Sequence, residues 1–132
     1  MLAIVNRFST FVCISVLYIS STLIAQNTEG PFTYYPNPSS GTFLGVATID
    51  ESPAEGTDVI AAYDNNGNCA GASMLIFNGG LAWIQLSIYG DDSTTPGVDE
   101  GINTGEAFSL VIWDASDDAF YQYNESFYGW IN

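Results

Sequence analysis

The pattern of apolar and polar residues is clearest between positions 81 and 89. The even positions of this segment are all apolar, whereas the odd positions are mixed. A period of two is typical of a β-strand with one face buried in a core. The apolar set is Ala82, Ile84, Leu86 and Ile88. The segment therefore predicts a central strand of a β-sheet.

The rest of the chain alternates short strand-like segments with turn-forming residues. Strands are expected at 31–35, 42–49, 57–63, 68–77, 81–89, 106–113 and from 119 onward. Between them stand residues that cannot continue a ladder, such as Pro36, Pro38 and the Asn66-Gly67 turn. No stretch has the period of an amphipathic helix. We therefore predict an all-β fold, a single two-sheet β-sandwich of immunoglobulin-like or jelly-roll-like type, with about 7–8 short strands.

The first 25 residues have the pattern of a cleavable secretory signal peptide. Arg7 supplies a short positive region, an apolar run follows from 8 to 24, and Ala25 is a small residue suited to cleavage. We predict three parts: a signal peptide at 1–25, an N-terminal arm with a Pro-rich linker at 26–38, and a β-sandwich domain at 39–132. The protein is then expected to be secreted, extracellular or on the cell surface, with no membrane insertion after signal removal.

The charge balance excludes several classes of partner and chemistry. Arg7 is the only Lys or Arg, there is no His, and all 15 Asp and Glu residues follow the signal. Nucleic acids and anionic membranes are bound through Lys and Arg, so neither is expected as a partner. Catalysis by His or Lys and zinc binding through His are excluded in the same way.

The remaining chemistry does not indicate an enzyme. Cys69 is the one thiol after the signal, and its neighbours Ala70, Gly71 and Ala72 indicate a small buried side chain more than a nucleophile. Paired carboxylates could hydrolyse glycosides, but nothing distinguishes one pair among fifteen acids. We therefore expect no enzymatic activity and assign no catalytic residues.

An acidic loop follows the central strand. Four carboxylates fall between positions 91 and 100, in a segment whose proline and glycines allow the chain to curl. Carboxylate and carbonyl oxygens are the ligands that Ca²⁺ takes, and a bound ion would relieve the repulsion among them. The expected ligands are Asp91, Asp92, Asp99, Glu100 and, reaching in from beyond the loop, Glu106. The alternative is a solvated acidic turn that binds no metal.

Aromatic residues are also abundant, particularly towards the C-terminus. Six aromatic side chains fall between positions 120 and 130. Exposed aromatic rings stack on sugars, so a surface polysaccharide is an alternative partner. The other interpretation is that these rings fill the sandwich core or meet a partner subunit.

Six short blocks along the chain carry a resemblance to a known group. They are VATID at 46–50, DVIAAYD at 58–64, GNCAG at 67–71, IYGDD at 88–92, GEAF at 105–108 and WDAS at 113–116. This series resembles a repeat module of secreted and surface proteins from Bacteroidota-like bacteria that use type IX secretion. The resemblance implies a small β-sandwich module, usually one of several in a larger protein, whose biochemical role is poorly defined.

Long uncharged stretches predict self-association. Residues 30–49 and 69–90 contain no charged side chain, and Lys, the usual guard of an exposed sheet edge, is absent after the signal. Exchange of a terminal strand between copies would then build a filament, with the arm at 26–35 preferred as donor over the C-terminal strand. The expected function is an extracellular structural or adhesive subunit that assembles with copies of itself, stabilised by Ca²⁺. A carbohydrate-binding module is the alternative.

Overall fold

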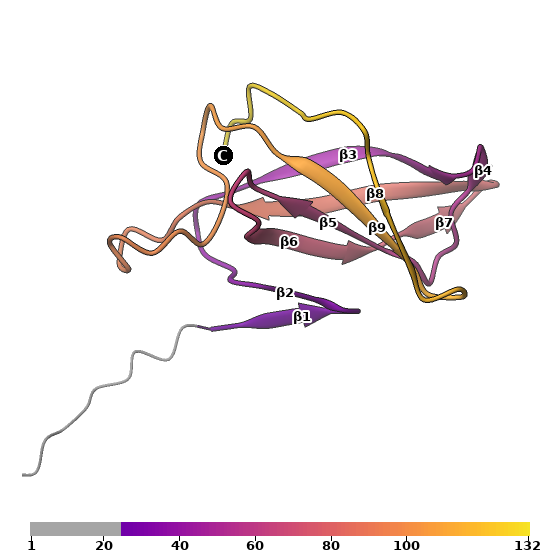
Figure 1. Cartoon of the computed structure of the whole chain (residues 1–132), viewed down its shortest axis with the longest axis horizontal. Helices are drawn as coiled ribbons and strands as arrows, with labels where there is room; N and C mark the ends of the chain where they lie inside the picture. The colour runs from indigo at the N-terminus through magenta and orange to yellow at the C-terminus, as the bar shows by residue number, and fades with distance from the viewer. Residues whose placement is uncertain (1–24) are drawn as a thin grey trace, which may run out of the picture.

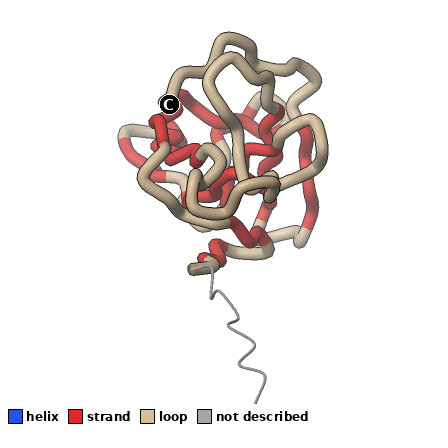
Figure 2. The backbone as a smooth tube through the Cα atoms, turned by 90° about the vertical axis from the view of Figure 1, so that its left-hand side faces the viewer, coloured by secondary structure: helices blue, strands red, loops and turns tan. Residues whose placement is uncertain are grey.

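A computed structural model describes residues 25–132, and the predicted signal peptide lies outside these residues apart from Ala25. The described part consists of strands and loops only, as Figure 2 shows. It contains no helix that could cross a membrane. The ten strands are β1 (Asn27–Glu29), β2 (Phe32–Tyr34), β3 (Ser40–Ile49), β4 (Ser52–Pro53), β5 (Val59–Tyr63), β6 (Cys69–Met74), β7 (Ile76–Asn78), β8 (Leu81–Tyr89), β9 (Ser109–Asp114) and β10 (Ala119–Gln122).

The strands form two four-stranded antiparallel sheets and a separate two-stranded pair. One sheet has the order β10-β9-β5-β6, the other has the order β4-β3-β8-β7, and β1 pairs only with β2. In Figure 1 the two large sheets overlie one another, with the β1–β2 hairpin below them. The prediction of an all-β fold is confirmed, and the arrangement is consistent with a β-sandwich.

The core lies between the two large sheets and follows the alternation in the sequence. The even positions of β8 are all buried, and their cross-strand neighbours on β3, which include Phe43 opposite Leu86, face the same interior. The opposite sheet contributes Ile60, Leu110 and Ile112, each at most 2% exposed. Because successive residues of a strand point to opposite sides, both sheets also have an outer face.

The predicted strand at 68–77 is in fact two strands in different sheets. β6 ends at Met74 and β7 begins at Ile76, with the buried Leu75 between them. The Leu75 N–H donates to the carbonyl of Asp58 at 2.9 Å, so the chain is fixed where it crosses from one sheet to the other. The apolar run looks continuous in the sequence because the exposed Ile76 and Phe77 of β7 follow the buried Leu75 directly.

The N-terminal arm lies against its own domain. Its turn places Gly30 at a positive φ of 54°, and the two strands pair from Asn27 opposite Tyr34 to Glu29 opposite Phe32. Phe32 is 3% exposed because it packs on the outer face of the β10-β9-β5-β6 sheet, with Val59 among its neighbours. The prolines at 36 and 38 do not hold this arm away from its own sheet. Burial of Phe32 stabilises the docked position and makes the arm a third layer.

Candidate functional site

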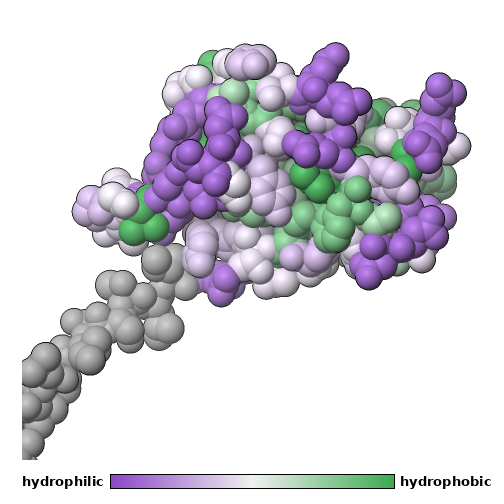
Figure 3. Space-filling model, in the orientation of Figure 1, coloured by the Kyte–Doolittle hydropathy of each residue, from purple (hydrophilic) through white to green (hydrophobic). Residues whose placement is uncertain are grey.

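Two loops meet at one end of the sandwich and bring the predicted acidic residues together with a turn that was predicted separately. The β8–β9 loop and the β5–β6 turn both lie at the left-hand end in Figure 1, and a patch of hydrophilic residues lies near that end in Figure 3. The Asn66 side-chain amide donates to Asp99 Oδ2 at 2.7 Å, which joins the two loops. This end is the candidate site for cations.

Asp91 organises the loop from within. Its Oδ1 accepts hydrogen bonds from the backbone N–H groups of Glu100 at 2.8 Å and Gly101 at 3.1 Å, and its Oδ2 accepts one from Asn103 Nδ2 at 2.6 Å. Partial burial opposes ionisation of Asp91, but these hydrogen bonds outweigh it and lower the pKa of its carboxyl group. Asp91 therefore acts as a clamp that closes the loop, with much of its acceptor capacity already used.

Glu100 is the most deeply buried carboxylate of the loop, at 3% exposure. Its Oε2 accepts a hydrogen bond from Thr95 Oγ1 at 2.8 Å and a longer one from the Asp92 N–H at 3.3 Å. Its Oε1 is also buried and has no hydrogen-bond donor among residues 25–132. A buried carboxylate oxygen without a partner is costly, so a water molecule or a cation would stabilise this position.

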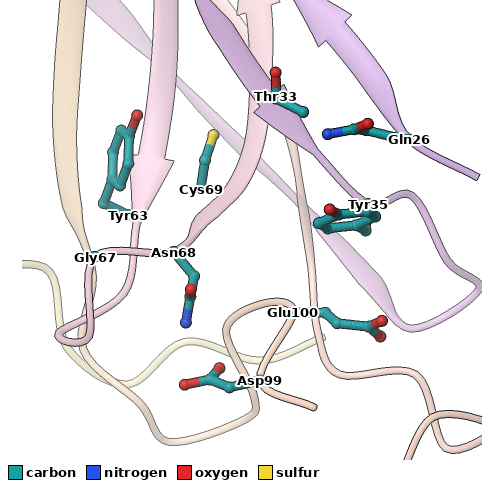
Figure 4. Close-up of a pocket in the computed structure, with 9 residues that line it drawn as sticks. All are labelled: Gln26, Thr33, Tyr35, Tyr63, Gly67, Asn68, Cys69, Asp99 and Glu100. Carbon is teal, nitrogen blue, oxygen red and sulfur yellow. The ribbon is translucent and has the colours of Figure 1, made fainter. Parts of the chain in front are cut away.

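Asp99 faces away from Glu100 and towards the β5–β6 turn. Figure 4 shows the two carboxylates pointing to opposite sides, with Asp99 directed towards the region of Asn68. The Asn66 hydrogen bond lowers the pKa of Asp99, but desolvation and the neighbouring carboxylates of Asp64 and Asp91 outweigh it, so the pKa of Asp99 is raised. The site thus has two separate acidic positions.

Asp64 belongs to this site and was not among the predicted ligands. Its Oδ1 accepts from the backbone N–H groups of Asn66 and Asn68, each at 2.8 Å, and its Oδ2 accepts from Asn68 Nδ2 at 2.9 Å. The sequence correctly indicated a tight turn here. The only signal for its proximity to Asp99 was that both loops could lie at the same end of a sandwich.

The other two predicted ligands have local roles. Asp92 Oδ1 accepts from the Thr94 N–H at 2.8 Å, and Glu106 Oε2 accepts from the Asn103 N–H at 2.7 Å, so each caps a turn. Across residues 25–132, no three Asp, Glu, Cys or His side chains are placed as a group that could hold a metal ion. The calcium site therefore stays a prediction, and Glu100 is the predicted ligand with a free buried oxygen.

A shallow cavity of about 340 Å³ lies between the acidic loops and the N-terminal arm. Figure 4 shows Tyr35 and Thr33 from the arm on one side, and Cys69 and Tyr63 on the other. Burial raises the pKa of the Cys69 thiol, although hydrogen bonds with Gly71 and Tyr63 oppose this shift. The thiol therefore stays protonated at neutral pH, which does not suit a nucleophile. Cys69 is half-buried, however, and not fully buried as predicted.

A second candidate site is the outer face of the β4-β3-β8-β7 sheet. Val46 of β3 lies directly opposite Trp83 of β8, which in turn lies opposite Ile76 of β7. These three side chains are 37%, 45% and 50% exposed, and Leu44 and Leu81 beside them are 70% and 40% exposed. We call this set of five residues the apolar face.

The apolar face is also free of charge. The four strands of its sheet contain no Asp, Glu, Lys or Arg. Trp83 Nε1 donates to the carbonyl of Asn78 at 3.2 Å, which fixes the indole over the β7–β8 turn. Contiguous exposed apolar residues are the usual mark of an interaction surface, so this face is a candidate for one.

Comparison with family models, curated proteins and solved structures finds no match for this chain. The resemblance to the repeat module of type IX-secreting bacteria therefore stays an expectation.

Proposed function

We propose that this protein is a secreted structural or adhesive subunit of the cell exterior that associates with copies of itself through the apolar face. The observation that carries the proposal is the cross-strand row of Val46, Trp83 and Ile76 on an uncharged sheet. Trp is the residue type most enriched among side chains that dominate binding energy at protein interfaces. A row of this kind gives a second molecule a rigid apolar surface.

Charge restricts where a second copy can contact this molecule. Residues 26–132 hold 15 carboxylates and no Lys, Arg or His. A cationic partner would be drawn to the acidic loops, whereas two copies repel each other wherever their carboxylates approach. The apolar face lets two copies meet with no charged side chain from the contacting strands. Ca²⁺ would support the assembly by screening the carboxylates around it.

The test compares the oligomeric state of residues 26–132 with that of a variant that lacks the Trp83 indole. Sedimentation velocity over a range of concentrations in Ca²⁺ should show reversible association. Trp83→Ser should weaken this association at least about tenfold, as expected for a side chain at the centre of an interface. Tyr128→Ser is the matched control, because Tyr128 is an aromatic residue at 82% exposure outside the apolar face.

Two outcomes would overturn the proposal. One is a chain that stays monomeric at the highest soluble concentration in Ca²⁺. The other is a Trp83→Ser variant that associates as strongly as the Tyr128→Ser control.

Carbohydrate binding is the second candidate, and the same residue supports it. An exposed indole on a flat sheet could stack on a sugar ring. Titration with a panel of soluble polysaccharides would then change tryptophan fluorescence in the wild type but not in Trp83→Ser. Four of the five side chains of the apolar face are aliphatic, however, which favours protein contact over sugar stacking.

A further inference from the structure

The β1–β2 hairpin is held on the sandwich by side chains alone. In the part of the chain that the structure describes, β1 and β2 pair only with each other, and no backbone hydrogen bond joins them to either large sheet. Phe32 makes edge contacts with Tyr63 and Phe120, at ring-centroid distances of 6.2 and 5.9 Å. Tyr34 stacks on Tyr89 at 5.8 Å. The hairpin is therefore a folded unit that can leave without breaking a ladder.

The C-terminal segment is attached in a different way. Phe127 and Phe108 exchange two backbone hydrogen bonds, of 3.0 and 2.8 Å, and the Gly105 N–H donates to the Trp130 carbonyl at 2.8 Å. The rings of Phe127 and Trp130 also pack against the main core. Removal of this segment would break both hydrogen bonds and core packing, so the N-terminal hairpin is the more detachable of the two ends.

The hinge next to the hairpin favours an extended chain. Tyr35 and Asn37 each precede a proline, which disfavours the α conformation for both residues and biases this segment towards extended backbone. Past the hinge the chain is fixed again, because the Asn37 amide donates to the Gly90 carbonyl and the Gly90 N–H donates to Ser39 O at 2.7 Å. The three residues from Tyr35 to Asn37 can span about 10 Å when extended.

We propose that the hairpin is exchanged between copies, so that residues 26–35 of one molecule occupy the same position on the outer face of the β10-β9-β5-β6 sheet of a second molecule. The hairpin fits this surface within one chain, and exchange would make the same contacts between two molecules. This inference rests on the proposed function, because it names the second contact through which the subunit would assemble.

The two contacts lie on opposite sides of the molecule. The hairpin covers the outer face of one sheet, with Phe32 against Val59 and Ala61, whereas the apolar face is the outer face of the other sheet. Reciprocal hairpin exchange pairs two molecules through one side and leaves the apolar face of each free. Alternation of two such symmetric contacts on opposite sides gives an open linear assembly, which is how a compact domain can build a filament.

A disulfide placed across the hairpin seat tests the exchange. A Cβ added at Gly30 would lie 3.0 Å from Val59 Cγ2, so Gly30→Cys with Val59→Cys can bring two sulfurs into bonding range. The background is Cys69→Ala, which removes the remaining thiol of residues 26–132. Oxidation after incubation at high concentration should give chains linked to one another, whereas oxidation at low concentration should give closed single chains that no longer exchange. The single variant Gly30→Cys is the control, because its interchain disulfides measure random collisions between molecules.

A second measurement does not depend on a residue at positive φ. Spin labels at Thr28→Cys and Asn65→Cys, both at exposed positions and on the same Cys69→Ala background, place one probe on the hairpin and one on the body. When the labelled chain is diluted into unlabelled chain, exchange should add a second, longer distance between the two labels. The fraction of molecules with this longer distance should increase with total protein concentration. Closed single chains at every concentration in the first experiment and an unchanged distance in the second would overturn the inference.

The same experiments separate this inference from the proposed function. Addition of Trp83→Ser should abolish association through the apolar face and leave interchain disulfides in place. Interchain disulfides together with association that Trp83→Ser leaves as strong as in the Tyr128→Ser control would refute the proposed face contact alone. Association that Trp83→Ser weakens, together with closed single chains at every concentration, would refute hairpin exchange alone.

Discussion

Phe32→Ala should release the N-terminal hairpin while the sandwich stays folded. Phe32 is 3% exposed and is the one fully buried side chain of the hairpin. Complete burial of a Phe side chain stabilises by about 1.5–3 kcal/mol. A two-stranded hairpin is marginal on its own, so this burial supplies most of the docking free energy.

The effect of Phe32→Ala on global unfolding has an upper limit. Truncation of Phe in a core costs about 3–5 kcal/mol, but here the hairpin can leave before the rest of the domain unfolds. The free energy of global unfolding cannot fall by more than the docking free energy, which we place at up to about 3 kcal/mol. Leu86→Ala is the comparison, because Leu86 is 0% exposed in the main core and its truncation should cost about 2–5 kcal/mol of global stability.

Hydrogen exchange and thiol labelling distinguish local release from global loss. In Phe32→Ala the amides of β1 and β2 should lose protection while those of β8 keep it. Cys69 packs beside the hairpin, so its labelling by a maleimide should become faster in the same variant. Leu86→Ala should weaken protection in both large sheets. If Phe32→Ala lowers protection in β8 as far as in β2, the hairpin is an integral part of the core and the reasoning is wrong.

Two further predictions concern the acidic loops. The pKa of Asp99 is raised, so the folded state binds the Asp99 proton more tightly than the unfolded state, and this contribution to stability is lost as the pH rises through the folded pKa. Asp99→Asn should therefore raise the melting temperature at pH 7 and not near pH 3. Asp91→Asn removes a carboxyl group of lowered pKa and should lower the melting temperature at pH 7. Excess Ca²⁺ should raise the melting temperature of the wild type but not of Glu100→Gln; a melting temperature that neither Ca²⁺ nor EDTA changes would refute the metal prediction.

The strands could be predicted because their alternation is a direct consequence of burial on one face. All four apolar even positions of β8 are in the core, as the pattern required. The division between β6 and β7 could not be predicted, because the apolar residues on both sides of Leu75 are equally suited to a single strand. The ten observed strands exceed the expected number for similar reasons: the arm became a hairpin, and Ser52–Pro53 pairs over two residues only.

The candidate site was predictable only within its own loop. The sequence grouped Asp91, Asp92, Asp99 and Glu100 because they are close along the chain, and Asp91 does bind the backbone of Glu100. It could not show that Asp91 uses its oxygens on loop donors, nor that Asp99 turns towards Asp64. Directions of side chains in a long loop depend on contacts between segments far apart in sequence, and a single sequence does not specify them.

The apolar face could not be predicted from the sequence either, although each of its residues could be recognised as apolar. Val46, Trp83 and Ile76 are 37 and 7 positions apart along the chain, and only the antiparallel register places them in one row. The alternation at 81–89 puts Trp83 on the mixed face of its strand, but it does not show which residues of other strands lie beside it. Exposed apolar residues become informative only when they are contiguous.

The edges of the sheets explain why assembly through a face and a hairpin is favoured over the direct pairing of edge strands that the uncharged stretches suggested. The β4 edge is two residues long, contains Pro53 and follows a turn with Asp50 and Glu51, which are standard guards against edge pairing. The β6 edge lies beside the hairpin, and the β7 and β10 edges are three and four residues long. These edges are short or covered, so they offer little backbone for pairing with a second copy. The apolar face and the surface under Phe32 are uncharged. Ordered association of two negatively charged copies is therefore expected to proceed through side-chain packing on these surfaces.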